Sequence, residues 1–435
     1  MRWNTAEYSG WGRALTASGQ LARPERASAV AALMDEEPAP AIGNRRSYGD
    51  ACLNDGGRAV DMTRMDRVLG FDPEAGEITV EAGVELGVLS RMLAPKGFLP
   101  AVMPGTGFAT VGGAIAMDVH GKNHHHAGSF GQHVAEITLQ TPKGERVVGE
   151  GTDLFRATVG GLGQTGVIVS AKLRLLKCKG DVIVVTERRV PGWDDFLALL
   201  DGSDATYTVG WIDATATGTK LGRGILEEAE TGSGLIPSKS TARRIKRNAP
   251  GWALSPGIVR AFNSLYYNRV PRSGRTSVKR LQDFFFPLDR IHDWNKLYGR
   301  RGFHQFQCVV PVDAAPALRA MLEKIATSGL ASPLAVLKRM GPGRAGFMSF
   351  PMEGYTLACD FRNVDRSTRL IRDLEQDVAE ARGRLYLAKD ALARGAHVRA
   401  MYPEHGDWLA EVQQVDPDKA LVTDLVRRLE LRAAP

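Results

Sequence analysis

Three glycine-rich segments that lie far apart in the chain place the strongest constraint on its fold. Their sequences are GNRRSYGDA (43–51), MPGTGFATVGGAIAMDVHGKNHHHAGSFG (103–131) and GGLGQTG (160–166). Glycine lets a backbone approach a ligand closely, and glycine-rich loops can turn their N–H groups toward a pyrophosphate. Any one of these segments alone would be an ordinary turn. Three of them in a region of interleaved helices and strands predict a bound cofactor.

The third segment contains GLGQTG (161–166), which matches the dinucleotide-binding pattern G-x-G-x-x-G. That pattern needs to follow a strand and to open a helix. Here it follows the helical stretch DLFRATVG and opens the strand-like stretch VIVSAKLRLL. The context is inverted, so the sequence does not predict a conventional NAD-binding fold.

The second segment holds four of the nine histidines, three of them consecutive at His124, His125 and His126, and His133 follows it closely. Neighbouring residues on a strand point to opposite faces, so an extended HHH cannot converge on one ion. No cysteine pair and no acidic partner stands nearby. We therefore predict no metal site, and we expect these three histidines to be packing or surface residues.

Length and charge narrow the function classes. A chain of 435 residues suggests two domains, and a net charge of +7 fits a phosphorylated substrate, an anionic lipid or simply a solvated basic surface. No nucleic-acid-binding signature is present, so no nucleic-acid partner is expected. The four scattered cysteines favour a reducing compartment. Without a signal-like or membrane-spanning apolar run, we expect a cytoplasmic protein, with peripheral contact at the inner membrane face left open.

The pattern of elements changes near residue 182. Helices and strands interleave from 25 to about 180, and strand–helix–strand units then repeat, which predicts an α+β domain on an antiparallel sheet. Residues 225–275 show no clear periodicity and are rich in Gly, Ser and Pro, which predicts a mobile loop. Near the end, RLYLAKDA (384–391) reads as a short strand and DKALVTDLVRRLEL (418–431) as a helix.

GNRRSYGDA, PGTGFATVGGAIAMDVHGKNHHHAGSFGQHV and ATVGGLGQTGVIV together resemble the FAD-binding domain of the vanillyl-alcohol-oxidase-type family. HGKNHH, AGSFG, RLYLAKD, AMYPEH and RRLEL resemble the branch of that family that oxidises polyprenylphosphoryl-riboses. The resemblance covers nearly the whole chain and is weakest over 215–280. It implies an FAD-binding domain (PCMH-type) over 1–180, an inserted α+β substrate-binding domain over 181–383, and a segment over 384–435 that returns to the FAD domain.

The resemblance also implies the cofactor site. FAD would be bound non-covalently, because Tyr48 stands in the loop where many relatives attach FAD through a histidine. The residues expected to contact FAD are Ile42, Gly43, Asn44, Arg45, Arg46, Ser47, Tyr48, Gly49, Asp50, Gly105, Thr110, Val111, Gly112, Gly113, Met117, Asp118, Val119, His120, Ile168 and Tyr386.

The implied catalytic residues are Lys389, His120 and Tyr48, with Lys389 near the substrate hydroxyl. Substrate binding is expected from Lys122, Gln305, Gln307, Lys338, Thr356 and Lys389. Gln305 and Gln307 are two apart on a predicted strand and therefore share a face. Lys338 is expected to reach a substrate phosphate.

Two positions depart from the family pattern. Its flavin-facing cysteine aligns with Ala358, and the asparagine two places earlier aligns with Thr356. Cys359 is shifted by one residue, which turns a strand side chain to the other face. We therefore assign Cys359 no role at the flavin, and these two changes leave the exact sugar open.

The implied reaction is FAD-dependent oxidation of the C2′ hydroxyl of a polyprenylphosphoryl-β-D-ribose to a 2-keto sugar, by hydride transfer to flavin N5. It would be the first half of an epimerisation to the arabinose form used in cell-wall arabinan. The implied partners are a lipid-linked phosphosugar, a separate NAD(P)H-dependent ketoreductase, and quinone or oxygen as electron acceptor. The alternatives are an FAD-dependent aldonolactone or alditol oxidase acting on a free small sugar, and a flavin-binding structural or sensor protein.

Overall fold

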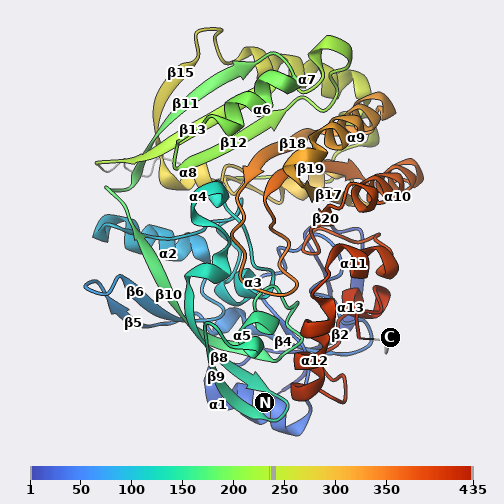
Figure 1. The fold of residues 1–435 in the computed structure, drawn as a ribbon. Coiled ribbons are helices and arrows are strands. Elements are labelled where there is room, and N and C mark those ends of the chain that lie inside the picture. The colour runs from blue at the N-terminus through green and yellow to red at the C-terminus, as the bar shows by residue number, and fades with distance from the viewer. Residues whose placement is uncertain (1, 235, 237–241, 433–435) are drawn as a thin grey trace.

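Two small sheets, one large sheet and a two-stranded pair organise the part of the chain that the computed structural model describes, which is residues 2–234, 236 and 242–432 (Figure 1). The four-stranded sheet has the order β1 (Asn4–Ser9), β2 (Thr16–Ala22), β4 (Arg58–Asp61), β3 (Ala41–Ile42). The next sheet has the order β5 (Val68–Asp72), β6 (Glu77–Glu81), β10 (Val167–Lys177), β8 (Val134–Thr141), β9 (Gly144–Gly149), with β7 (Phe98–Pro100) paired to β10. Their helices are α1 (Ala27–Glu36), α2 (Leu86–Leu93), α3 (Val111–Ala116), α4 (His124–Ala127) and α5 (Asp153–Thr158).

The large sheet has eight strands, and its neighbouring strands pair antiparallel. Its order is β15 (Arg275–Arg280), β11 (Val182–Val190), β13 (Gly224–Gly232), β12 (Tyr207–Ile212), β18 (Ala331–Met340), β19 (Gly354–Arg362), β17 (Phe303–Val310), β20 (Arg384–Leu385). The predicted α+β class with an antiparallel sheet is confirmed.

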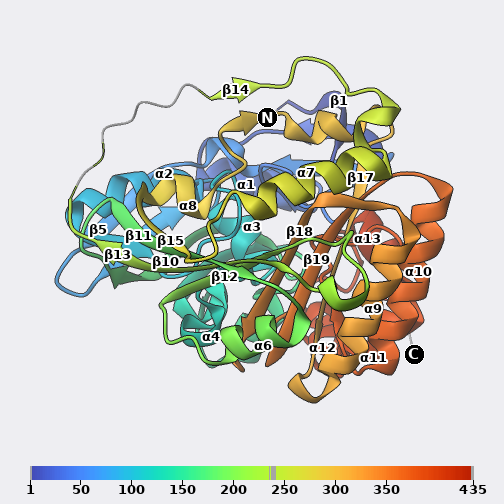
Figure 2. The ribbon, with the colours of Figure 1, turned by 90° about the horizontal axis from the view of Figure 1, so that it is seen from above.

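The two faces of the large sheet have different partners. Helices α6 (Trp193–Asp201), α9 (Ala315–Ser328) and α10 (Asp365–Glu380) pack on one face, where alternate strand residues such as Leu337, Leu357 and Cys359 are fully buried in the largest hydrophobic core. Helix α7 (Pro256–Asn268) lies on the opposite side, and α8 (Leu281–Phe285) follows β15 (Figure 2). Side chains alternate along a strand, so the strand residues next to these core positions point to the opposite face of the large sheet. That face is turned toward the two small sheets.

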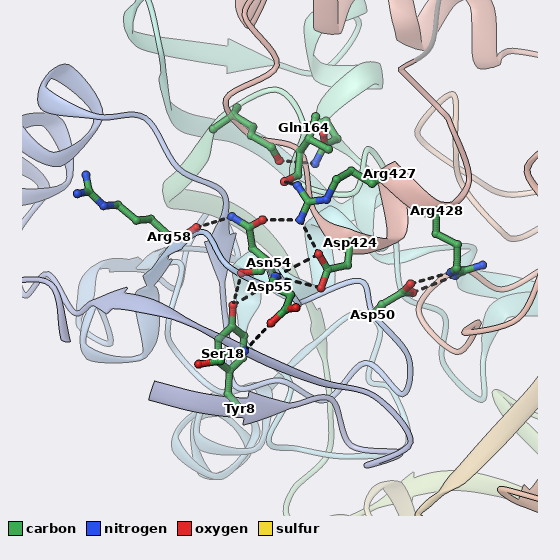
Figure 3. Close-up of polar contacts among 12 residues, drawn as sticks. Tyr8, Ser18, Asp50, Asn54, Asp55, Arg58, Gln164, Asp424, Arg427 and Arg428 are labelled. Atoms are coloured by element: carbon green, nitrogen blue, oxygen red, sulfur yellow. Dashed lines mark hydrogen bonds and ion pairs between the residues drawn. The ribbon is translucent and has the colours of Figure 1, made fainter. Parts of the chain in front are cut away.

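The end of the chain returns to its beginning. Helices α11 (Gly395–Met401), α12 (His405–Val415) and α13 (Asp424–Arg428) follow β20. Arg428 bonds Asp50 at 2.7 Å, and the backbone N–H of Asp55 donates to Asp424 at 3.1 Å (Figure 3). Arg428 also bonds Asp390 at 2.8 Å. The domain boundaries at 180 and 383 stay a prediction, since β20 is still paired to β17 of the large sheet.

Two local predictions are wrong, and two predicted elements are longer than those observed. Residues 225–275 are not one loop, because β13 covers Gly224–Gly232 and α7 covers Pro256–Asn268. The charged residues Glu227 and Glu228 make the strand β13 hard to recognise in the sequence. In the structure, Lys279 and Arg188 on neighbouring strands form ion pairs with them. The three histidines begin the single helical turn α4 and are not extended.

The C-terminal helix is shorter than the predicted 418–431. Asp416 accepts the backbone N–H groups of Ala420 and Leu421, and Lys419 has a positive φ of 59°. This local side-chain turn competes with helix formation until Asp424. The predicted strand at 384–391 likewise stops at Leu385, where the chain turns so that the Lys389 N–H bonds the Tyr386 carbonyl.

No helix among the described residues is long and apolar enough to cross a membrane.

Candidate active site

A cavity of about 570 Å³ lies against the face of the large sheet that is opposite α9 and α10. All three glycine-rich segments contribute to the wall of this cavity. The first segment supplies residues 43–48 and Ala51, the second supplies residues between 103 and 122, and the third supplies Leu162 and Gly163. Arg45, in the first segment, has a φ of 52°. The fold therefore gathers three loops of the kind that can hold a pyrophosphate by its oxygens.

Most of the residues predicted to bind the cofactor line this cavity. They are Ile42, Gly43, Asn44, Arg45, Arg46, Ser47, Tyr48, Gly105, Thr110, Gly113, Met117, Val119, His120 and Tyr386. The predicted substrate residues Lys122, Gln305, Gln307, Lys338, Thr356 and Lys389 line it as well. Contact with FAD itself stays a proposal for all of them.

The structure does not bring six predicted cofactor residues to the cavity wall. Val111 and Ile168 are buried in the hydrophobic core. The carboxylate of Asp118 accepts bonds from the Ser349 hydroxyl and the Gly131 N–H. The remaining three make packing or ion-pair contacts within the protein and are Gly49, Asp50 and Gly112.

Arg46 is the side chain in the cavity wall that most clearly needs an anion. Its guanidinium lies between the rings of Trp11, at 4.4 Å, and Phe108, at 4.6 Å. Its Nε is buried without a hydrogen-bond partner among the described residues. Burial lowers the pKa of Arg46, against the attraction of Asp289 and Glu85. A pyrophosphate oxygen would satisfy this donor, so the residues present fit FAD.

We expect Arg46→Met to weaken FAD binding by about tenfold to a hundredfold, which is the loss of one charged hydrogen bond. The dissociation constant can be measured by titrating the apoprotein with FAD and following flavin fluorescence. Arg26→Met, which removes an exposed arginine before α1, is the matched control and should bind FAD normally. Unchanged affinity in the Arg46 variant would show that this guanidinium does not hold the cofactor.

His120 is the centre of one polar cluster. Its Nδ1 lies 2.9 Å from Lys338 Nζ, and its Nε2 lies 3.0 Å from Gln307 Nε2. A neutral imidazole has one donor and one acceptor nitrogen. Either the Lys338 ammonium donates to Nδ1 and the Gln307 amide presents its oxygen to Nε2–H, or a neutral Lys338 accepts from Nδ1–H. Burial, with the charges of Lys122 and Lys389, lowers the pKa of Lys338 to about 7, so both arrangements are accessible near neutrality.

Lys389 is the centre of a second cluster. Its Nζ lies 3.6 Å from the centroid of the Tyr48 ring. Burial lowers the pKa of Lys389 to about 7, and the carboxylate of Asp360 opposes that shift. Burial raises the pKa of Asp360 itself to about 7, although Gln305 and Tyr298 both donate hydrogen bonds to it, at 2.5 and 3.0 Å. An amine with this pKa can accept or release a proton at neutral pH.

The remaining predicted positions behave as follows. Ala358 lines the cavity and Cys359 is buried in the core on the other face of β19, as the one-residue shift predicts. The Thr356 hydroxyl accepts from Gln307 at 3.3 Å. Lys122 donates to the Phe284 carbonyl, and burial lowers the pKa of Lys122 to about 8. Lys338 lines the cavity and bonds His120, and its expected contact with a substrate phosphate stays a prediction.

Sequence reasoning missed the end of the cavity formed by α7 and its neighbours. Trp211, Tyr266, Arg269, Leu334 and Val336 line this part. Tyr266 and Arg269 fall within the stretch predicted as a loop, so no helical pattern pointed to them. Trp211 and Val336 lie on β12 and β18, and alternation along a strand cannot by itself say which face borders a cavity.

Comparison with known proteins defines the class. A family model described as the FAD binding domain matches residues 20–150. A decaprenylphosphoryl-β-D-ribose oxidase of Mycolicibacterium smegmatis is 36% identical over 98% of this chain and 98% of its own length. An L-gulono-1,4-lactone dehydrogenase of Mycobacterium tuberculosis is 22% identical over 97% of this chain and 98% of its own length. A D-arabinono-1,4-lactone oxidase of Yarrowia lipolytica is 26% identical over 31% of this chain and 28% of its own length.

These matches and the cavity identify an FAD-dependent oxidoreductase, so the predicted cofactor and enzyme class are confirmed. More particularly, the chain belongs to the decaprenylphosphoryl-β-D-ribose oxidase family, as the resemblance of its motifs predicted.

Proposed function

We propose that this enzyme oxidises the C2′ hydroxyl of a polyprenylphosphoryl-β-D-ribose to the 2-keto sugar. The observation that carries the proposal is the Lys389 amine, whose pKa is about 7, in a cavity that also presents His120 and two glutamines. The 36% identical relative, which is named for decaprenylphosphoryl-β-D-ribose, supports the substrate class.

The chemistry needs a proton acceptor beside the hydroxyl and a hydride acceptor beside the carbon. FAD, when bound, supplies the hydride acceptor. Neutral Lys389 would take the hydroxyl proton, and the Tyr48 ring would stabilise the ammonium that results. Gln305 is held by Asp360 and Gln307 by Thr356, so both amides are oriented before the sugar arrives. His120 would stay neutral beside Lys338, because burial and the charge of Lys338 lower the pKa of His120 well below its usual value.

The other end of the cavity supports a lipid-linked sugar. Val209, Trp211, Leu334 and Val336 give it an apolar wall, which suits a prenyl chain better than a free sugar. Arg269 lies at the same end and is already paired with Glu187 at 2.7 Å. We do not assign the phosphate to one residue.

Anaerobic mixing of the FAD-loaded protein with farnesylphosphoryl-β-D-ribose tests the proposal. The flavin absorbance should bleach with this compound and not with its 2-deoxyribose analogue, which has no C2′ hydroxyl. Equal bleaching by aldonolactones or alditols would favour the alternative of a free-sugar oxidase, which the lactone-oxidising relatives support. If the purified protein binds FAD but none of these compounds bleaches the flavin absorbance, the alternative of a flavin-binding structural or sensor protein would be favoured.

Asp360→Asn tests the role given to Lys389 through the pH profile of flavin reduction. The variant removes the carboxylate that raises the pKa of Lys389, so that pKa should fall. Since the neutral amine is the base, the rise of the reduction rate with pH should move to lower pH by about one unit. Stopped-flow reduction across neutrality measures the midpoint, and Asp313→Asn, at an exposed carboxylate, is the control. An unmoved midpoint would mean that Lys389 is not the titrating base.

Four further assignments remain predictions. The keto sugar would be reduced by a separate NAD(P)H-dependent ketoreductase, which completes the epimerisation for cell-wall arabinan. Quinone or oxygen would reoxidise the flavin. The protein would act in the cytoplasm, with FAD held non-covalently.

A further inference from the structure

Helix α7 carries an apolar stripe that nothing in the described chain covers. Ile258, Phe262 and Leu265 are spaced as i, i+4 and i+7 and therefore share one side of the helix. All three are exposed, Leu265 at 75%, and Trp252 just before the helix is exposed at 69%. Large apolar side chains gathered in this way mark an interaction surface.

The surroundings of this stripe are cationic. Residues 231–282 contain no Asp or Glu. Exposed cations precede α7 at Arg243, Arg244, Lys246 and Arg247, lie on it at Arg260, and follow it at Arg272. The strand β14 (Arg243–Arg244) is held by parallel pairing with β16 (Ile291–His292), both of whose residues line the cavity. We call the apolar stripe, Trp252 and these six cations the α7 surface.

The α7 surface is joined to the cavity by a continuous run of aromatic rings. Phe262 stacks on Tyr266 with ring centroids 6.0 Å apart, and Tyr266 contacts Trp211 at 4.7 Å. Tyr266 and Trp211 both line the cavity. Figure 2 shows α7 on the side of the large sheet opposite α9 and α10. The same helix therefore carries a residue of the cavity wall, Tyr266, and an exposed residue of the stripe, Phe262.

We propose that the α7 surface docks on an anionic phospholipid bilayer. Apolar side chains would enter the headgroup region while the flanking cations meet lipid phosphates, which is how interfacial helices bind. A protein partner would be expected to bring acidic side chains to this face, but a bilayer supplies both the apolar and the anionic component at once. The proposal rests on the proposed function, because it names the surface through which a lipid-linked substrate would pass between membrane and cavity.

Co-sedimentation of the FAD-loaded protein with vesicles tests the docking. Binding to phosphatidylglycerol vesicles should be at least tenfold tighter than to phosphatidylcholine vesicles and should weaken as salt is raised. Leu265→Asp should weaken it at least tenfold, whereas Leu69→Asp, at an exposed leucine of β5, should not. The triple variant Arg247→Gln, Arg260→Gln, Arg272→Gln leaves the apolar stripe intact and should lose the preference for anionic lipid.

Several outcomes would overturn the docking. One is that Leu265→Asp binds phosphatidylglycerol vesicles as tightly as the wild type does. Another is that the wild type binds neither phosphatidylglycerol nor phosphatidylcholine vesicles. A dimer that Leu265→Asp converts to a monomer, with no vesicle binding, would assign the surface to a second copy of the chain.

Flavin reduction by water-soluble farnesylphosphoryl-β-D-ribose separates this proposal from the proposed function. Reduction by that compound without vesicle binding would leave the function standing and remove the docking. Vesicle binding without flavin reduction by that compound would leave the docking standing and remove the proposed function.

Discussion

Lys389→Met should lower the rate of flavin reduction by about a thousandfold at neutral pH, since a positioned general base contributes about a hundredfold to ten-thousandfold. Methionine keeps an unbranched side chain of similar length against the Tyr48 ring but cannot accept a proton. Stopped-flow reduction by farnesylphosphoryl-β-D-ribose measures the rate under saturating substrate.

The controls for this variant separate chemistry from binding. FAD content and the thermal unfolding midpoint of Lys389→Met should match those of the wild type. Lys96→Met, at an exposed lysine after α2, should reduce at the wild-type rate. If the flavin of Lys389→Met is reduced at the wild-type rate, Lys389 is not the base. His120 and Lys338 would then be the remaining candidates.

Arg428→Met should lower the free energy of unfolding by about 3 kcal/mol, because it leaves buried carboxylates without their counter-charge. The side chains of Asp50 and Asp390 are 5% and 7% exposed, and the Arg428 guanidinium bonds both. Burial raises the pKa of Asp50 even with Arg428 in place, so a lone carboxylate there would be costlier still. Urea titration of the FAD-loaded protein, followed by flavin fluorescence, measures the effect.

Two further variants show whether the buried charge is the cause. Arg382→Met breaks an ion pair with Asp313 in which both side chains are mostly exposed, and it should cost about 1 kcal/mol or less. Adding Asp50→Asn and Asp390→Asn to Arg428→Met should recover part of the lost stability, because no unpaired carboxylate remains. A loss no larger than that of Arg382→Met would mean that this bridge is not a main support of the fold.

The three glycine segments and the strand carrying Gln305 and Gln307 could be predicted because their signals are local. Glycine spacing marks close backbone approach, and alternation on β17 puts both glutamines on one face. The same rule placed Cys359 in the core and Ala358 at the cavity.

The parts that could not be predicted depend on distant partners. The strand β13 contains Glu227 and Glu228, and only the cations of neighbouring strands make those charges acceptable in a sheet. Helix α7 exposes three large apolar residues, so its pattern does not separate a buried side from a polar one. Asp50 and Gly49 lie in the predicted pyrophosphate loop, but they contact the C-terminal part of the chain, which local sequence cannot reveal.

The contacts of Tyr48, Gly49 and Asp50 with the far end of the chain also bear on biosynthesis. The Tyr48 N–H bonds the Ala388 carbonyl, and a Cβ on Gly49 would collide with the carbonyl of Asp390. Arg428 then clamps Asp50 to Asp390. During translation, Tyr48 leaves the ribosome hundreds of residues before Lys389, and Arg428 emerges last of these groups. The turn that carries the base can therefore be locked to the first glycine loop only after Arg428 has emerged, so a shorter nascent chain lacks the contacts that fix Lys389 beside Tyr48.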